Sequence, residues 1–206
     1  MAKRPRRLRV EDLDVIRIEE LAEVIKSGEV AVLPTDTIYG FHALADDGDA
    51  LDRIFAIKGR ETTKPLPVLF SSIQQLADLG ADLDHARSCL ESIWPAPLTA
   101  VLRLKKPLAA TVGQLTVAAR IPASEWLRHL LSMTGPLAST SLNRSGDPPA
   151  ASLENLPPDS LDDVAIVVDG GVLDGQPSTV VEFTETLPRV IRQGAFVFTQ
   201  NLWKTL

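Results

Sequence analysis

Apolar residues recur along the chain in two periods, one typical of helices and one typical of strands. In the segment 17–26 the apolar positions lie three and four residues apart, which places them on one face of a helix, and Gly28 closes this predicted helix. The inward-facing positions are Ile18, Leu21, Ala22 and Ile25. A strand over 30–33 follows, so the predicted core begins with a helix and a strand.

The alternation of helices and strands continues over most of the chain. We expect a second helix to begin at Asp49 as its N-cap and a third to begin at Ser71 or Ser72. Further helices are predicted over 86–94 and 124–133, and strands over 65–70, 98–104, 116–122, 135–140, 164–171, 178–183 and 188–194. This order predicts a single-domain α/β fold, a mixed open sheet with helices on its faces.

Composition agrees with one globular domain. The chain has 206 residues, of which 45% are hydrophobic and 23% charged. Charges or prolines interrupt every apolar run before the roughly 20 residues that a membrane helix needs. The single cysteine, Cys89, excludes an internal disulfide, and the first ten residues lack the apolar core of a secretory signal. We therefore expect a cytoplasmic protein without membrane association.

The charge is unevenly distributed. Five of the 21 basic residues lie within the first nine positions, so 16 remain against 27 acidic residues in the rest of the chain, a net charge of −11. This negative charge makes sequence-independent binding to nucleic acid less favourable, although the basic N-terminal residues could contact a polyanion. We expect residues 1–12 to form a flexible basic N-terminus and residues 13–206 to form the domain.

Several familiar catalytic motifs are absent. The sequence has no phosphate-binding loop of the Walker type, no Gly-x-Gly-x-x-Gly, no Gly-x-Ser-x-Gly and no pair of His or Cys residues at metal-ligand spacing. His42, His85 and His129 stand apart in sequence, and we expect surface or supporting positions for them. We therefore predict no metal site built from protein ligands.

Polar residues instead follow two of the predicted strands. Thr35, Asp36, Thr37 and Tyr39 come directly after the first strand, and the segment 139–145 offers Ser139, Thr140, Ser141, Asn143 and Ser145. Open α/β sheets bind ligands at the carboxyl ends of their strands, and hydroxyl and amide groups can hold a polar ligand there. The same residue types also form turns and caps, so each segment alone is open to either interpretation.

Cations complete the candidate site. Lys58 and Arg60 flank Gly59 at the end of a predicted helix, an arrangement that suits a polyphosphate or stabilises the helix end. Arg120 and Arg192 lie within predicted strands, where each must face a cleft or pair with a structural carboxylate.

Taken together, these segments resemble a known family. "PTDTIYG", "IKGR" followed by "KPLPVL", "WPAPLT", "TVAARIP", "STSLNRSG", "PSTVVEF" and "VIRQG" occur in the order found in the YrdC-like (TsaC/YrdC/YciO) family of L-threonylcarbamoyladenylate synthases. The resemblance implies a twisted mixed sheet around a deep central cavity. It also implies synthesis of threonylcarbamoyl-AMP and pyrophosphate from L-threonine, bicarbonate or CO2, and ATP, with Mg2+, towards N6-threonylcarbamoyladenosine in tRNA.

The resemblance also implies roles for individual residues. The threonine site would comprise Thr35, Tyr39, Arg120, Ser139 and Ser178. The ATP site would comprise Lys58, Arg60, Thr116, Ser141, Asn143 and Arg192, of which Lys58, Arg60, Ser141 and Asn143 would also serve the catalytic centre. Downstream threonylcarbamoyl transferase proteins would receive the product.

Three residues depart from the pattern of the longer family members. Glu61 replaces a proline, Leu69 a histidine and Pro149 lies near the position of a serine, and a carboxylate at position 61 could compete for Arg60. The end at Leu206 favours the short, single-domain form. Two alternatives remain: the carbamoyladenylate chemistry of hydrogenase maturation carbamoyltransferases, and a non-catalytic, YciO-like paralogue that binds double-stranded RNA, tRNA or ribosomes.

Overall fold

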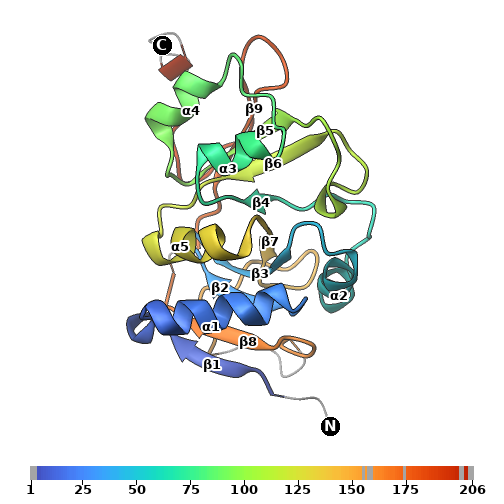
Figure 1. The fold of residues 1–206 in the computed structure, drawn as a ribbon, viewed down its shortest axis with the longest axis vertical. Helices are drawn as coiled ribbons and strands as arrows, with labels where there is room; N and C mark the ends of the chain where they lie inside the picture. The colour runs from blue at the N-terminus through green and yellow to red at the C-terminus, as the bar shows by residue number, and fades with distance from the viewer. Residues whose placement is uncertain (1–3, 155, 157–159, 174, 200–201, 204–206) are drawn as a thin grey trace.

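The fold is a ten-stranded mixed sheet with helices on both faces (Figure 1). The computed structural model describes residues 4–154, 156, 160–173, 175–199 and 202–203. The α-helices of this part are α1 (Val15–Lys26), α2 (Gly48–Lys58), α3 (Ile73–Asp78), α4 (Arg87–Ile93) and α5 (Glu125–Thr134), with 3-10 turns at Val10–Asp12 and Ala109–Thr111. The strands are β1 (Arg6–Arg9), β2 (Ala31–Pro34), β3 (Tyr39–Leu44), β4 (Val68–Leu69), β5 (Leu98–Arg103), β6 (Thr116–Arg120), β7 (Leu137–Ser141), β8 (Ile166–Asp169), β9 (Thr179–Glu182) and β10 (Arg189–Arg192).

The strand order is β1-β8-β2-β3-β7-β4-β6-β5-β9-β10. The sheet contains parallel pairs, such as β4 with β6 and β5 with β9, and antiparallel pairs, such as β3 with β7 and β5 with β6. The predicted class, an open mixed α/β sheet flanked by helices, is therefore confirmed.

The two faces of the sheet carry different helices. Buried residues of α1 and α5 form one apolar cluster with Leu33, Leu69 and Leu137, whereas residues of α2, α3 and α4 form a second cluster with Phe41 and Val68. Figure 1 shows α1 and α5 side by side in front of β2, β3 and β7, and the two helices contact each other. Each face thus has its own core.

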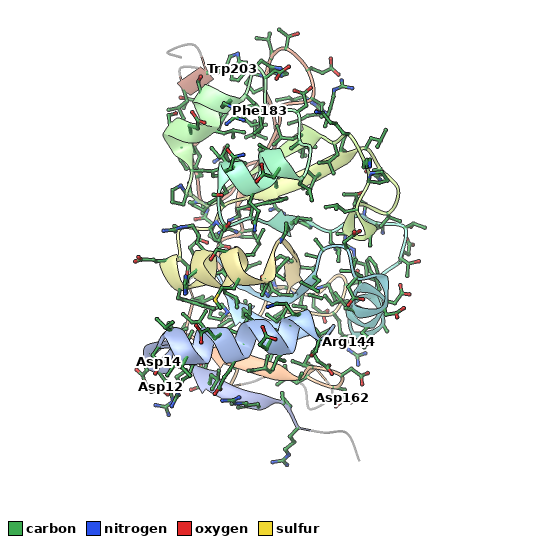
Figure 2. The ribbon with its side chains drawn as sticks, viewed as in Figure 1. Asp12, Asp14, Arg144, Asp162, Phe183 and Trp203 are labelled. Atoms are coloured by element: carbon green, nitrogen blue, oxygen red, sulfur yellow. The ribbon has the colours of Figure 1, made fainter. Side chains whose placement is uncertain are left out.

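The helices α1 and α2 each begin directly after an aspartate that caps the first turn. Asp14, labelled at the start of α1 in Figure 2, accepts a hydrogen bond from the backbone amide of Arg17 at 2.9 Å, and the four predicted inward positions of α1 are all buried. The expected N-cap Asp49 was wrong, because Asp47 accepts from the amide of Ala50 at 3.0 Å and α2 begins at Gly48. Asp49 lies instead in the first helical turn, where its negative charge favours the helix dipole.

The N-terminal segment differs from the expectation of a flexible, basic stretch over 1–12. Residues Arg6–Arg9 form β1, which pairs in parallel with β8, and Leu8 is buried in the cluster beneath α1. Arg6 also pairs with Glu20 of α1, at 2.6 Å. Leu8 alternates with exposed arginines, so this segment supplies one apolar side chain to the core and three cations to the surface.

The tail of the chain closes the opposite end of the sheet. Phe183, just after β9, lies 5.9 Å from Trp203 between ring centroids, and Figure 2 shows both side chains at the same end of the molecule. His85 lies edge-on to the same indole, at 6.1 Å. These aromatic contacts extend the core beyond the last strands.

The close approach of β3 to β7 leaves no room for a side chain at Gly40. A Cβ atom there would lie 2.8 Å from the carbonyl oxygen of Thr140 and 3.0 Å from Cε1 of His42. We predict that Gly40→Ala lowers the free energy of unfolding by about 1–3 kcal/mol, because backbone atoms must shift to admit the methyl group.

The matched control for this substitution is Gly48→Ala. A Cβ atom at Gly48 meets nothing within 4 Å, and the residue lies in a helix. Its effect should stay within about 1 kcal/mol, on the stabilising side. Urea unfolding of both variants measures the difference, and equal stability of the two would show that the β3–β7 contact imposes no such constraint.

Candidate functional site

A cavity of about 480 Å³ lies on the face of the sheet that carries α1 and α5. Of the residues predicted for threonine, it is lined by Thr35, Tyr39, Arg120, Ser139 and Ser178. Of those predicted for ATP, it is lined by Arg60, Thr116, Ser141 and Arg192. Lys58 and Asn143 are not among the lining residues. The structure thus brings nine of the eleven predicted residues to one cavity.

Strand alternation places these side chains on one face. Directly opposite residues of paired strands share a face, and Ser139 lies opposite His42 while Ser141 lies opposite Gly40. On the next strands, Arg120 lies opposite Leu69, which belongs to the apolar cluster of α1 and α5. The period of two along β6 then brings Thr116 and Arg120 to the same side.

Arg120 is the most buried cation of the cavity lining, at 6% exposure. Its guanidinium donates to Oδ1 of Asp36 at 2.5 Å and to Oγ1 of Thr37 at 2.9 Å, while its Nε is buried and has no partner in the described part of the chain. Burial lowers the pKa of Arg120, and the neighbouring Asp36 acts in the opposite direction. Arg120 therefore does both things that the sequence left open: it faces a cavity and it pairs with a carboxylate.

Arg60 and Arg192 are held differently. Arg60 donates to the carbonyl of Pro65 at 3.1 Å, and Arg192 donates to the carbonyl of Ser178 at 2.9 Å. Partial burial lowers the pKa of both guanidinium groups. Within the described ranges neither arginine forms an ion pair, and Glu61, which could have competed for Arg60, pairs instead with Lys64 at 3.2 Å.

The hydroxyl of Thr35 organises the turn between β2 and β3. It donates to the carbonyl of Ile38 at 2.8 Å and accepts from the backbone amides of Thr37 and Ile38 at 3.1 and 3.2 Å. Thr35 therefore stabilises this turn through its hydroxyl group and also lines the cavity.

The phenol of Tyr39 ties β3 to the end of β8. Its oxygen donates to the carbonyl of Gly171 and accepts from the amide of Gly170, both at 2.8 Å. Burial raises the pKa of the phenol. The hydroxyl is therefore used for structure, and Tyr39 contributes to the cavity as part of its wall.

Lys58 reaches the segment after β7 from the end of α2. Its Nζ donates to the carbonyl of Ser141 at 2.5 Å, to the carbonyl of Asn143 at 2.9 Å and to Oδ1 of Asn143 at 2.8 Å. Burial, followed by the charge of Arg60, lowers the pKa of Lys58 to about 8. Ser141 Oγ also donates to Oδ1 of Asn143, at 2.5 Å. Lys58 thus holds Ser141 and Asn143 in place from behind the cavity wall.

Sequence reasoning missed some polar residues of the site. Thr99 lines the cavity, and its hydroxyl lies 2.8 Å from that of Ser178. It ends the quoted segment "WPAPLT", two positions before Val101 on the same strand face, so alternation along β5 could have identified it. Asp36 and Thr37 were noted as polar but not assigned to Arg120, because their partner lies 83 or 84 residues away.

His42 supports the cavity from within the sheet. It is fully buried, and its Nε2 lies 3.1 Å from Oγ of Ser139, which lines the cavity. Burial lowers the pKa of His42 to about 4, and the charge of Arg120 acts in the same direction. The imidazole is therefore neutral at physiological pH. Among the alternatives of a surface or a supporting position, the structure places it in the supporting one.

Metal ligands are not clustered in the described part of the chain. No group of three or more His, Cys, Asp or Glu residues there is arranged to hold a metal ion. Likewise, no helix among the described residues is long and apolar enough to cross a membrane.

Because the imidazole of His42 is buried, we predict that the free energy of unfolding depends on pH. Between pH 6.5 and about 4 the unfolded chain binds a proton at His42 that the folded protein does not bind. The free energy of unfolding should therefore fall as the pH drops through this range, by up to about 3 kcal/mol from this residue. Urea unfolding at a series of pH values should show a weaker dependence for His42→Gln; an unchanged dependence would contradict the assignment.

Comparisons with known proteins agree with this geometry. Residues 23–194 match the model of the Sua5/YciO/YrdC family, which carries the description "Telomere recombination". The threonylcarbamoyl-AMP synthase of Pyrococcus abyssi is 35% identical over 189 residues, which are 89% of this chain and 56% of that protein. A putative threonylcarbamoyl-AMP synthase of Mycobacterium tuberculosis is 36% identical over 174 residues, which are 82% of this chain and 80% of that protein.

A solved structure of P. abyssi Sua5 complexed with L-threonine superimposes with a TM-score of 0.79 at 33% identity. The match covers 92% of this chain and 56% of that chain, so this sequence spans little more than half of the longer P. abyssi protein. The family model covers most of the chain, and the resemblance seen in the ordered motifs is confirmed. The chain belongs to the Sua5/YciO/YrdC family.

Proposed function

We propose that the protein is a threonylcarbamoyl-AMP synthase, a nucleotidyltransferase that combines L-threonine, bicarbonate or CO2, and ATP for the N6-threonylcarbamoyladenosine modification of tRNA. The observation that carries the proposal is the lining of the cavity, which includes three arginines and several hydroxyl groups but no aspartate or glutamate among its described residues. Such a lining suits two anionic substrates. Relatives with the corresponding printed name support the choice of reaction.

In this proposal, threonine occupies the part of the cavity around Arg120. The carboxylate of the amino acid would meet the guanidinium, which belongs to the most buried cation of the cavity lining. Ser139 and Ser178 would supply hydroxyl groups beside it, while Thr35 and Tyr39 form the adjoining wall. The P. abyssi structure named as an L-threonine complex supports the choice of threonine as the amino acid.

ATP would occupy the part of the cavity around Arg60 and Arg192. Both arginines are free of carboxylate partners in the described structure, so their charge is available for phosphate oxygens. Thr116 and Ser141 would add hydroxyl contacts. We assign Lys58 a supporting role, because its three hydrogen bonds hold Ser141 and Asn143 at the catalytic centre.

Mg2+ fits this site only when the ion is bound to ATP. Magnesium favours carboxylate and phosphate oxygens, and the described lining offers hydroxyl and guanidinium groups, with Asp36 already paired to Arg120. The triphosphate would therefore hold the ion, which would neutralise phosphate charge.

The chemistry needs no side-chain nucleophile. The neutral amine of threonine adds to CO2, forming an N–C bond and releasing one proton, to give an N-carboxylate. An oxygen of this N-carboxylate attacks the α-phosphorus of ATP; an O–P bond forms while pyrophosphate leaves with the electron pair of the broken bond. The residues of the cavity would bring the two anions into line and neutralise their charge.

The departures from the family pattern leave the phosphate side of the site intact. Glu61 is directed to Lys64 rather than to Arg60. Leu69 and Pro149 both line the cavity and make its wall more apolar. We propose that these substitutions are compatible with the reaction.

The RNA-binding alternative gains no support from the basic N-terminal segment. Arg6 and Arg9 pair with Glu20 and Glu11, at 2.6 and 3.1 Å, which reduces the charge available to a polyanion.

The carbamoyltransferase alternative rests on solved structures below 20% identity, which indicate the fold alone. In the proposed pathway tRNA enters after this step, in the cytoplasm, where downstream threonylcarbamoyl transferase proteins would receive the adenylate.

Pyrophosphate release from ATP tests the proposal directly. We expect release only when L-threonine and bicarbonate are both present, and a loss of at least about 100-fold in Lys58→Ala and Arg60→Ala, because charge stabilisation and positioning are removed. Glu61→Gln, which alters an exposed ion pair outside the cavity, should retain activity. Release that is independent of threonine would contradict the proposed function.

The lowered pKa of Lys58 predicts a loss of order at alkaline pH. A protonated Lys58 has three N–H donors for its three oxygen partners, whereas the neutral amine has only two. Amide resonances of Ser141 and Asn143 should therefore shift with a midpoint at pH of about 8, together with a fall in the rate of pyrophosphate release. The shift should be absent in Lys58→Met; a shift that persists there would assign the titration to another group.

A further inference from the structure

The three arginines of the cavity lining differ in how their charge is balanced. Arg60 and Arg192 each donate to a backbone carbonyl, and neither pairs with a carboxylate among the described residues. Arg120, in contrast, is paired with the carboxylate of Asp36, at 2.5 Å. The cavity therefore has two positive subsites and one subsite close to neutral.

The Asp36–Arg120 pair is deeply set. The two side chains are 13% and 7% exposed, so their charges are weakly screened by solvent. Asp36 is not itself among the lining residues, whereas Arg120 is. Asp36 thus acts on a ligand of the cavity through Arg120 and through the electric field at that wall.

The pairing also limits which donors of Arg120 remain for a ligand. One terminal nitrogen donates to Asp36 and the other to Thr37, while Nε is buried, with no partner among the described residues. Each terminal nitrogen carries a second N–H, which can be donated to an oxygen of a ligand in the cavity. This arrangement suits one carboxylate better than a chain of phosphates.

Because a second cation, Arg192, lies near Arg120, the neutralisation of Arg120 by Asp36 matters for the charge of this subsite. The charge of Arg192 is near enough to lower the pKa of Arg120, so the two guanidinium groups feel each other. Without a carboxylate beside Arg120, the two cations would together attract a polyphosphate. The carboxylate of Asp36 offsets the charge of one of these two cations, Arg120.

We propose that Asp36 is a specificity-determining residue that neutralises Arg120, so that this subsite takes the single carboxylate of the amino acid and rejects triphosphate and pyrophosphate. The inference rests on the proposed function, because it assigns the amino acid to Arg120 and the phosphates to Arg60 and Arg192. Selection of this kind arises from an unfavourable contact with the wrong ligand as much as from a favourable contact with the right one.

Asp36→Asn tests the proposal, because asparagine keeps an oxygen for Arg120 and removes only the charge. We expect inorganic pyrophosphate to bind the variant at least about tenfold more tightly than the wild type in calorimetric titrations. Bound pyrophosphate should then compete with L-threonine in the variant and not in the wild type. Damage to the fold would weaken binding, so a gain of affinity cannot arise from structural loss.

Glu61→Gln is the matched control. It removes one carboxylate close in sequence to Arg60, but one that is exposed and paired with Lys64. Its affinity for pyrophosphate should equal that of the wild type. A gain as large as that of Asp36→Asn would assign the effect to net charge and overturn the proposal, as would unchanged pyrophosphate affinity in Asp36→Asn.

Asp36→Asn leaves a buried cation without its counter-charge, so a second variant guards against failure to fold. In the double variant Asp36→Asn, Arg120→Gln both charges are absent. We expect wild-type affinity for pyrophosphate and a loss of threonine binding of at least about tenfold, because the neutralised Arg120 takes no part in holding phosphate. A fall in pyrophosphate affinity would show that Arg120 binds phosphate in the wild type, and would overturn the proposal.

The same titrations separate this inference from the proposed function. A wild type that binds neither threonine nor ATP would contradict the proposed function. The pyrophosphate affinities of the wild type and the three variants would still decide whether Asp36 controls polyanion binding at Arg120.

Discussion

The antiparallel pairing of β3 with β7 is the contact on which the cavity depends. It sets Gly40–Leu44 against Leu137–Ser141 and so joins the polar segment after β2 to the polar segment at the end of β7. Gly40 permits the approach because a side chain there would collide with the Thr140 carbonyl. His42 and Ser139, 97 positions apart in the chain, become direct neighbours through this pairing. Other residues of the lining, such as Arg120 on β6 and Arg192 on β10, come from the strands beyond β7 in the sheet.

Buried cations set the electrostatics of this site. A buried charge must be hydrogen-bonded or paired, and the protein meets this demand in different ways. Lys58 is satisfied by three oxygens of the segment after β7, so its charge holds the wall together. Arg120, also buried, donates to Asp36 and Thr37. Arg60 and Arg192 are more exposed; they donate to backbone carbonyls and pair with no carboxylate among the described residues. The two parts of the cavity thus differ in charge although both contain arginine.

Several hydroxyl groups of the site serve the fold and the cavity together. Thr35 closes the turn that carries Asp36 and Thr37, and Tyr39 anchors the start of β3 to the end of β8. Their hydrogen bonds fix the positions of the groups that face the ligand, which lowers the cost of ordering them when substrate binds. The neutral His42 does the same for Ser139 without adding a positive charge beside Arg120.

The sequence by itself determined the properties that depend on neighbours along the chain. Apolar periodicity predicted the inward face of α1 and the order of helices and strands, and the family resemblance carried by the ordered motifs predicted nine residues of the cavity wall. Only the tertiary structure decided that Asp36 neutralises Arg120, that Lys58 supports the wall from behind, and that the basic N-terminal segment is an edge strand. These outcomes depend on strand order and on which residues face each other across the sheet, and local periodicity carries no information about partners more than 80 residues away.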